Sequence, residues 1–127
     1  MSRVLIIEAD KLLAGNLKGY LERAGHSVSW RTDPQSAVNS ADKHRPDVVI
    51  LDLVLSGHNG VEFLYEFRSY PEWLTVPIII YSGLPPEELS GAEPALAELT
   101  IGAYHYKPAT SLEQLAASVE RLAAVSA

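Results

Sequence analysis

The sequence predicts an α/β fold in which helices are wound on both faces of a parallel sheet. Short apolar runs, such as residues 4–7 and 78–80, alternate with segments in which apolar residues recur at helical spacing. This alternation is typical of repeated strand–helix units, and strands buried on both faces of a parallel sheet have such continuous apolar sequences. A length of 127 residues suits one folding unit, so we expect a single domain over residues 1–127.

Composition and charge exclude several classes of protein. Cysteine is absent, which excludes disulfides and every cysteine-based metal or redox site. The formal net charge of -6 argues against direct binding to nucleic acid, because the phosphates of nucleic acid require basic partners. The apolar runs are too short for a signal sequence or a membrane span, so we expect a cytoplasmic protein without membrane contact.

Two strand–helix units open the chain. The apolar run at residues 4–7 predicts the first strand, and the helix behind it has Asp10 as its N-cap and Gly25 as its stop signal. Apolar and polar residues alternate at 28–30, which indicates the second strand. The Asp-Pro pair at 33–34 then starts the second helix, since proline is well tolerated in a first turn.

Three further units complete the predicted fold. Their strands are expected at residues 47–52, 77–82 and 103–106. Residues 56–60 are rich in glycine and polar residues and predict a loop before the third helix, while the alanine-rich stretch 92–99 predicts the fourth helix. A capping box from Thr110 to Glu113 indicates the start of the fifth helix.

Polar side chains lie at the carboxyl ends of four predicted strands, the edge where doubly wound sheets bind their ligands. They are Glu8 and Asp10 after the first strand, Asp52 as the last residue of the third, Ser82 as the last residue of the fourth, and Lys107 after the fifth. These residue types suit phosphoryl transfer to a carboxylate, with Asp52 as the nucleophile and with Ser82 and Lys107 holding the phosphoryl group. Glu8 and Asp10 would supply oxygen ligands for Mg²⁺.

Each of these residues also has a simpler structural interpretation. An aspartate such as Asp52 commonly forms a turn at a strand end, and a serine such as Ser82 can bond its own backbone. Lys107 could be a solvated charge, and Asp10 could serve only to cap its helix. The joint placement of all of them at one edge favours the phosphoryl site.

The motifs along almost the whole chain resemble those of the response-regulator receiver family. They are RVLIIE at residues 3–8, VVILDL at 48–53 with Gly57 and Gly60 behind it, IIIYS at 78–82 and YHYKP at 104–108. The resemblance implies a flavodoxin-like fold, in which a five-stranded parallel sheet of order 2-1-3-4-5 and five helices form three layers. It also implies a phosphoprotein of two-component phosphorelay signalling, and not an enzyme.

The resemblance assigns roles to single residues. Asp52 is the phosphoacceptor and would receive its phosphoryl group from a histidine kinase or a phosphotransfer protein. Ser82 and Lys107 sense that group, while Ser82 and Tyr104 form a conformational switch, although Tyr104 could also merely pack against the fifth helix. Lys107–Pro108 is a candidate cis peptide. A downstream protein target or a second copy of the chain would bind the face made by the fourth helix, the fifth strand and the fifth helix.

The sequence departs from the family pattern at Ala9, where the resemblance places a second acidic residue. Alanine cannot ligate Mg²⁺, so either Asp10 replaces the missing ligand or Mg²⁺ is held weakly by Glu8, Asp52 and the backbone carbonyl of Val54. We therefore expect weakened metal-dependent phosphorylation.

Two other functions fit parts of the sequence. Because of Ala9, the chain could be a pseudo-receiver that binds partner proteins without phosphorylation, although the joint presence of Asp52, Ser82 and Lys107 argues against it. A flavin-binding or hydrolytic enzyme of the same fold class is a second alternative. The sequence offers it no glycine-rich phosphate cradle and no G-x-S-x-G elbow.

Overall fold

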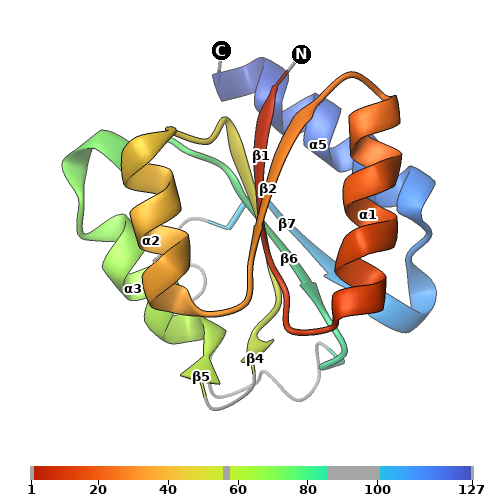
Figure 1. The fold of residues 1–127 in the computed structure, drawn as a ribbon, viewed down its shortest axis with the longest axis horizontal. Coiled ribbons are helices and arrows are strands. Elements are labelled where there is room, and N and C mark those ends of the chain that lie inside the picture. Colours follow the sequence, from red (N-terminus) through yellow and green to blue (C-terminus); the bar gives the residue numbers. More distant parts are fainter. Residues whose placement is uncertain (1, 56–57, 86–100, 127) are drawn as a thin grey trace.

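A five-stranded parallel sheet forms the centre of the molecule (Figure 1). The computed structural model describes residues 2–55, 58–85 and 101–126. The strands of the sheet are β1 (Arg3–Ile7), β2 (Ser27–Arg31), β3 (Val48–Leu51), β6 (Ile78–Ser82) and β7 (Ala103–Tyr106). Their order, β2-β1-β3-β6-β7, is the predicted order 2-1-3-4-5, because β4 and β5 form a separate pair.

Helices cover both faces of the sheet, which confirms the predicted three layers (Figure 1). On one face lie α1 (Lys11–Arg23) and α5 (Leu112–Ser126), and on the other lie α2 (Pro34–Lys43) and α3 (Gly60–Arg68). Two 3-10 helices, η1 (Pro71–Trp73) and η3 (Lys107–Ala109), were not predicted. The helix predicted at 92–99 lies outside the described residues. Among the described helices, none combines the length and the apolar content that crossing a bilayer requires.

Two apolar clusters hold the helices against the sheet. Successive residues of a strand point to opposite faces, so Ile6 and Ile50 pack in the cluster beneath α1 and α5, whereas Ile7 and Leu51 pack beneath α2 and α3. All four residues of β3 are buried. Burial on both faces explains why the central strands have uninterrupted apolar sequences.

The predicted helix caps at the start of the chain are confirmed. The Asp10 carboxylate accepts a hydrogen bond from the backbone N of Leu13 at 3.1 Å, and the Asp33 carboxylate accepts one from the backbone N of Ser36 at 3.0 Å. Gly25, just beyond α1, has a φ of 98°, a value that glycine adopts without steric cost. Local side chains therefore fix where α1 and α2 begin, and the backbone conformation of Gly25 allows the chain to turn away where α1 ends.

The loop prediction for residues 56–60 is partly wrong. β4 (Val54–Leu55) pairs antiparallel with β5 (His58–Asn59), and α3 already begins at Gly60. Residues 56 and 57 lie outside the described residues. A strand of two residues is too short to show an alternating pattern, so this pair has no signature in the sequence.

The capping box of α5 lies one residue later than predicted. Ser111 Oγ accepts a hydrogen bond from the backbone N of Gln114 at 3.1 Å, and the Gln114 side chain accepts one from the backbone N of Ser111 at 2.8 Å. Thr110 instead donates its hydroxyl to the Tyr106 carbonyl at 2.8 Å. The reciprocal pair therefore involves Gln114 and not Glu113, because Ser111 is the residue that directly precedes the helix.

Candidate functional site

The carboxyl ends of β1, β3, β6 and β7 meet at the lower edge of the sheet in Figure 1, where β4 and β5 also lie. Glu8 follows β1, Asp52 follows β3, Ser82 ends β6 and Lys107 follows β7. Glu8, Asp52 and Ser82 are buried, at 3%, 5% and 0% exposed. The topology thus brings polar residues from distant parts of the sequence to one buried edge.

Lys107 joins two carboxylates at this edge. Its Nζ lies 2.7 Å from Oδ2 of Asp52 and 2.7 Å from Oε1 of Glu8. The backbone places it there, because Lys107 starts η3 directly after β7. The Lys107–Pro108 peptide is trans, contrary to the expectation from the resemblance, and trans is the form that most X-Pro bonds adopt.

Burial and charge act in opposite directions on these groups. Burial, the largest effect, raises the pKa of Glu8, and the charge of Asp52 adds to it, while the hydrogen bond from Lys107 opposes it. For Lys107, burial lowers the pKa, but the hydrogen bonds and charges of Asp52 and Glu8 together outweigh burial and raise it. The two carboxylates therefore keep Lys107 in its charged form, which can also interact with a negatively charged group bound at this edge.

The backbone after β3 orients the Asp52 carboxylate. Its Oδ1 accepts a hydrogen bond from the backbone N of Val54 at 3.0 Å, while Oδ2 is bound to Lys107. Gly60, the first residue of α3, packs directly against this turn: a Cβ at Gly60 would lie 2.5 Å from the Asp52 carbonyl oxygen and 2.7 Å from Leu53 Cα. Only glycine permits this close approach.

Ser82 and Tyr104 are linked through one residue. Ser82 Oγ accepts a hydrogen bond from the backbone N of Leu84 at 3.2 Å, and the Tyr104 hydroxyl donates to the Leu84 carbonyl at 2.5 Å. Among the described residues, Ser82 forms no hydrogen bond with Asp52 or Lys107. The simpler interpretation of Ser82, a hydroxyl bonded to its own backbone, therefore describes this structure, and its role in phosphate sensing stays a prediction.

Asp10 serves as a helix cap in this structure. Its side chain is exposed and is bonded to Leu13, while its backbone N donates to Glu8 Oε2 at 3.0 Å. Ala9 is also exposed and offers no side-chain ligand. The role of Asp10 as a metal ligand stays a prediction.

The site suits Mg²⁺, but with few protein ligands. In the part of the chain that the structure describes, no group of three or more His, Asp or Glu side chains is arranged to hold a metal. Mg²⁺ commonly binds through one or two carboxylates and keeps several waters, and Glu8 and Asp52 supply this number. Their two negative charges exceed the single positive charge of Lys107. Glu8, Asp52 and the carbonyl of Val54 are thus the groups that would hold the ion.

Two aromatic residues of the site were missed by the sequence analysis. The indole Nε1 of Trp30, on the neighbouring strand β2, donates to the Glu8 carbonyl at 2.8 Å. The ring of Tyr81, on β6, lies with its centroid 5.6 Å from Lys107 Nζ, a cation–π distance. Both contacts join residues on or directly after neighbouring strands, so the spacing of residues along the sequence does not predict them.

Comparison with known proteins identifies a family. The sequence matches the response regulator receiver domain family over residues 4–119. It is 32% identical over 80 residues to the virulence transcriptional regulatory protein PhoP of Salmonella typhimurium strain LT2, and this alignment covers 63% of the chain. The same alignment covers 35% of PhoP, so the chain spans about a third of the length of that relative.

Solved structures share the fold over nearly the whole chain. A putative response regulator from Chloroflexus aurantiacus J-10-fl is 26% identical, with a TM-score of 0.82 and coverage of 97% of this chain and 98% of that one. A sensor protein from Polaromonas sp. JS666 has a TM-score of 0.87 at 22% identity, and the match covers 98% of both chains. The family match, the sheet order and these likenesses agree, and the chain belongs to the response regulator receiver domain family of two-component signalling.

Proposed function

We propose that this receiver domain accepts a phosphoryl group on Asp52 from a histidine kinase or a phosphotransfer protein, and that the modification changes its affinity for partner proteins. The observation that carries the proposal is the position of Lys107 Nζ, 2.7 Å from the Asp52 carboxylate at the carboxyl edge of the sheet. A lysine in this place can neutralise charge that develops on a phosphoryl group attached to Asp52. The domain is then a substrate of phosphotransfer and a signalling module, not an enzyme in its own right.

The chemistry requires a nucleophile, a leaving group and charge neutralisation. A carboxylate oxygen of Asp52 attacks the phosphorus of a phosphohistidine, and the phosphorus–nitrogen bond breaks as the new phosphorus–oxygen bond forms. The bonding electron pair leaves with the imidazole nitrogen, which then takes up a proton. Lys107 provides positive charge, and the Ser82 hydroxyl, whose oxygen accepts a hydrogen bond from the backbone N of Leu84, can donate its O–H to a phosphoryl oxygen.

Mg²⁺ would supply further positive charge to the phosphoryl oxygens when bound at Glu8, Asp52 and the Val54 carbonyl. Receiver domains in general depend on Mg²⁺ for phosphorylation. Because Ala9 removes one carboxylate from this edge, we propose that the affinity for Mg²⁺ is low and that phosphorylation is correspondingly slow.

The contacts of Leu84 support a route from the site to a partner surface. Ser82 and Tyr104 both bond to the Leu84 backbone, so a movement of Ser82 toward a phosphoryl group would disturb the support of the Tyr104 hydroxyl. Tyr104 lies on β7, and its side chain packs in the apolar cluster beneath α2 and α3 and not against α5, so the interpretation of Tyr104 as mere packing on the fifth helix is wrong. We propose that a downstream protein or a second copy of the chain binds the face that includes β7 and α5.

The test is incubation with acetyl phosphate and Mg²⁺, followed by intact-mass measurement. The wild type should gain the mass of one phosphoryl group, while Asp52→Asn should gain none. Asp42→Asn, which removes an exposed acid from α2, is the matched control and should be phosphorylated like the wild type. Equal behaviour of the wild type and Asp52→Asn would contradict the proposal.

Ala9 favours a second candidate function, that of a pseudo-receiver that binds partners without phosphorylation. In this case the contacts of Lys107 with Glu8 and Asp52 would form a permanent internal ion pair. A wild type that stays unmodified by acetyl phosphate and unchanged in its amide NMR spectrum with beryllofluoride and Mg²⁺ would support this function over the first.

A further inference from the structure

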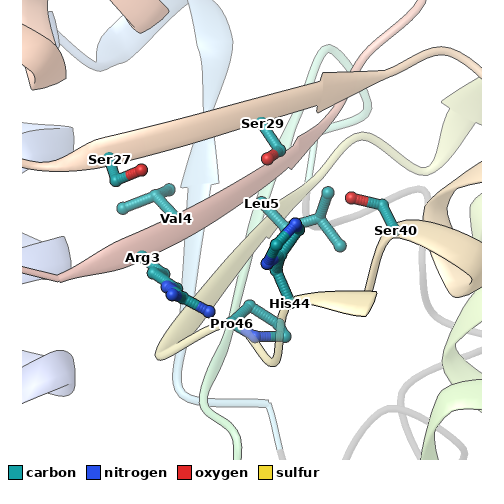
Figure 2. Close-up of a pocket in the computed structure, with 8 residues that line it drawn as sticks. All are labelled: Arg3, Val4, Leu5, Ser27, Ser29, Ser40, His44 and Pro46. Atoms are coloured by element: carbon teal, nitrogen blue, oxygen red, sulfur yellow. The ribbon is translucent and has the colours of Figure 1, made fainter. Parts of the chain in front are cut away.

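We propose that a hollow between α2 and the β1–β2 side of the sheet binds a phosphate group, either free or as part of a small ester. The cavity has a volume of about 280 Å³. Five polar residues line it: Arg3, Ser27, Ser29, Ser40 and His44 (Figure 2). Arg3 and Ser27 are the first residues of β1 and β2, so the hollow lies toward the opposite end of the sheet from Asp52 and is separate from the proposed phosphorylation site.

The hollow results from the alternation of small polar and large apolar residues along β2. Val28 and Trp30 point to the face that carries α1 and α5, where they pack against an apolar cluster. Ser27 and Ser29 alternate with them and therefore face α2. Serine is too small to fill the space beneath a helix, and α2 itself presents Ser40 there, which is 6% exposed.

The pairing of the strands brings a cation to the same face. Arg3 pairs with Ser27, and Leu5 pairs with Ser29, so Arg3 lies on the serine side of the sheet. His44 follows the last residue of α2 as its C-cap. Figure 2 shows these side chains, from β1, β2 and the end of α2, around a common space.

The polar side chains of the hollow have no hydrogen-bond or ion-pair partner among the residues that the structure describes. Within residues 2–55, 58–85 and 101–126, no hydrogen bond or ion pair involves the side chains of Arg3, Ser27, Ser29, Ser40 and His44. Ser40 is largely buried and Ser29 is half-buried, whereas Arg3, Ser27 and His44 are exposed at the mouth of the hollow, where water binds their polar groups when no ligand is present. Donors that converge on a cavity without protein acceptors are available to a ligand rich in acceptors.

The donor set matches an oxyanion. A guanidinium binds phosphate oxygens through a planar fork of N–H groups, and serine hydroxyls donate to the remaining oxygens. The volume is close to the lower limit of ligand pockets, which suits a small ester and not a peptide. Two features oppose an anion: the C-terminal end of α2, with its partial negative charge, and Asp47, which accepts a hydrogen bond from the Arg3 backbone N at 2.7 Å. Binding must therefore depend strongly on the Arg3 side chain.

The test is a titration followed by two-dimensional amide NMR, at constant ionic strength and with EDTA to keep Mg²⁺ away from Asp52. The probes are inorganic phosphate, ribose 5-phosphate and, as the uncharged counterpart, ribose. The amides of Ser27, Ser29 and Ser40 should shift saturably with one or both phosphate compounds and not with ribose. Saturation by inorganic phosphate would identify the free anion as sufficient, whereas saturation by ribose 5-phosphate alone would show that the ester is required.

Variants distinguish this site from unspecific binding. Arg3→Gln should weaken the affinity at least about fivefold, because a charge-assisted contact is lost. Arg23→Gln removes the same charge from an exposed position at the end of α1 and should bind like the wild type. Ser29→Val keeps Arg3 but replaces a hydroxyl donor with methyl groups, so it should weaken the binding, and it tests the site independently of the folding of Arg3→Gln.

Three results would overturn the proposal. The first is the absence of shifts at the amides of Ser27, Ser29 and Ser40 when either phosphate compound is added up to about 10 mM. This concentration is roughly ten times a dissociation constant of 1 mM, so a site of that affinity would be nearly saturated. The second is equal affinity of the wild type and Ser29→Val. The third is a response confined to the amides of Ser82 and Gly83, which would place the anion at the other end of the sheet.

Discussion

At the scale of single residues, the balance between Lys107 and its two carboxylate partners sets the stability of the site. In Lys107→Met, Glu8 and Asp52 stay buried without a counter-charge, and we expect the free energy of unfolding to fall by about 3 kcal/mol. Urea unfolding near neutral pH, without Mg²⁺, measures this change. Lys43→Met, at an exposed position in the last turn of α2, should change the free energy by less than about 0.5 kcal/mol. A similar loss of unfolding free energy in both variants would show that the contacts of Lys107 with the buried carboxylates do not contribute specifically to stability.

A second prediction at this scale concerns the missing acid at position 9. Ala9→Asp adds a carboxylate next to Glu8, and we expect the affinity for Mg²⁺ and the rate of phosphorylation by acetyl phosphate to rise about tenfold. Ala9→Asn has a similar shape without the charge and should gain much less. Isothermal titration with MgCl₂ and intact-mass time courses measure the two effects. An aspartate variant with the affinity and rate of the wild type would show that Ala9 does not limit the site.

The part of the site that could be predicted consists of residues that end or directly follow the predicted strands. Asp52 and Lys107 belong to this group, because the strands before them fix which edge of the sheet they reach. The Asp10 carboxylate could cap a helix or bind Mg²⁺, and the sequence does not distinguish these roles. The structure shows that it accepts a hydrogen bond from the backbone N of Leu13. The contacts of Trp30 and Tyr81 depend on which strands are neighbours, which residue spacing does not reveal.

At the scale of secondary-structure elements, two glycines should respond to alanine in opposite directions. In Gly60→Ala, the new Cβ would overlap the Asp52 carbonyl at the start of α3, and we expect a loss of about 2 kcal/mol in the free energy of unfolding. In Gly15→Ala, the new Cβ meets nothing within 4 Å on the exposed side of α1, and we expect a gain of about 0.5–1 kcal/mol. Thermal or urea unfolding of both variants is the measurement. A stable Gly60→Ala protein would mean that α3 can move away from the phosphoacceptor turn.

The secondary-structure elements differ in how well their sequences predict them. β3 and β6 were predictable because each is an unbroken apolar run, and α1 because Asp10 and Gly25 mark its ends. The β4–β5 pair was not, since two residues per strand carry no period. The shift of the α5 capping box has a different cause, because both Thr110 and Ser111 are acceptable caps and the chain uses the one next to the helix.

At the scale of the whole molecule, α5 is held to the sheet by an apolar cluster and by a polar contact inside the interface. Leu115 and Val119 of α5 pack in the cluster with Ile6 and Ile79. Beside them, His105 Nε2 lies 2.7 Å from Ser118 Oγ, between β7 and α5. Burial lowers the pKa of His105 from its ordinary value of 6.5, and the charge of Arg121 lowers it further.

This lowered pKa links the stability of the whole domain to pH. As the pH falls below 6.5, the unfolded chain takes up a proton at His105 more readily than the folded chain, so the stability from neutral His105 is present above that pH and is lost below it. The free energy of unfolding of the wild type should therefore decline more steeply between about pH 7.5 and 5.5 than that of His105→Gln. His44→Gln, which changes an exposed histidine, should follow the wild type. Urea unfolding curves across this range measure the difference, and parallel curves for the wild type and His105→Gln would show that α5 stays on the sheet independently of the charge of His105.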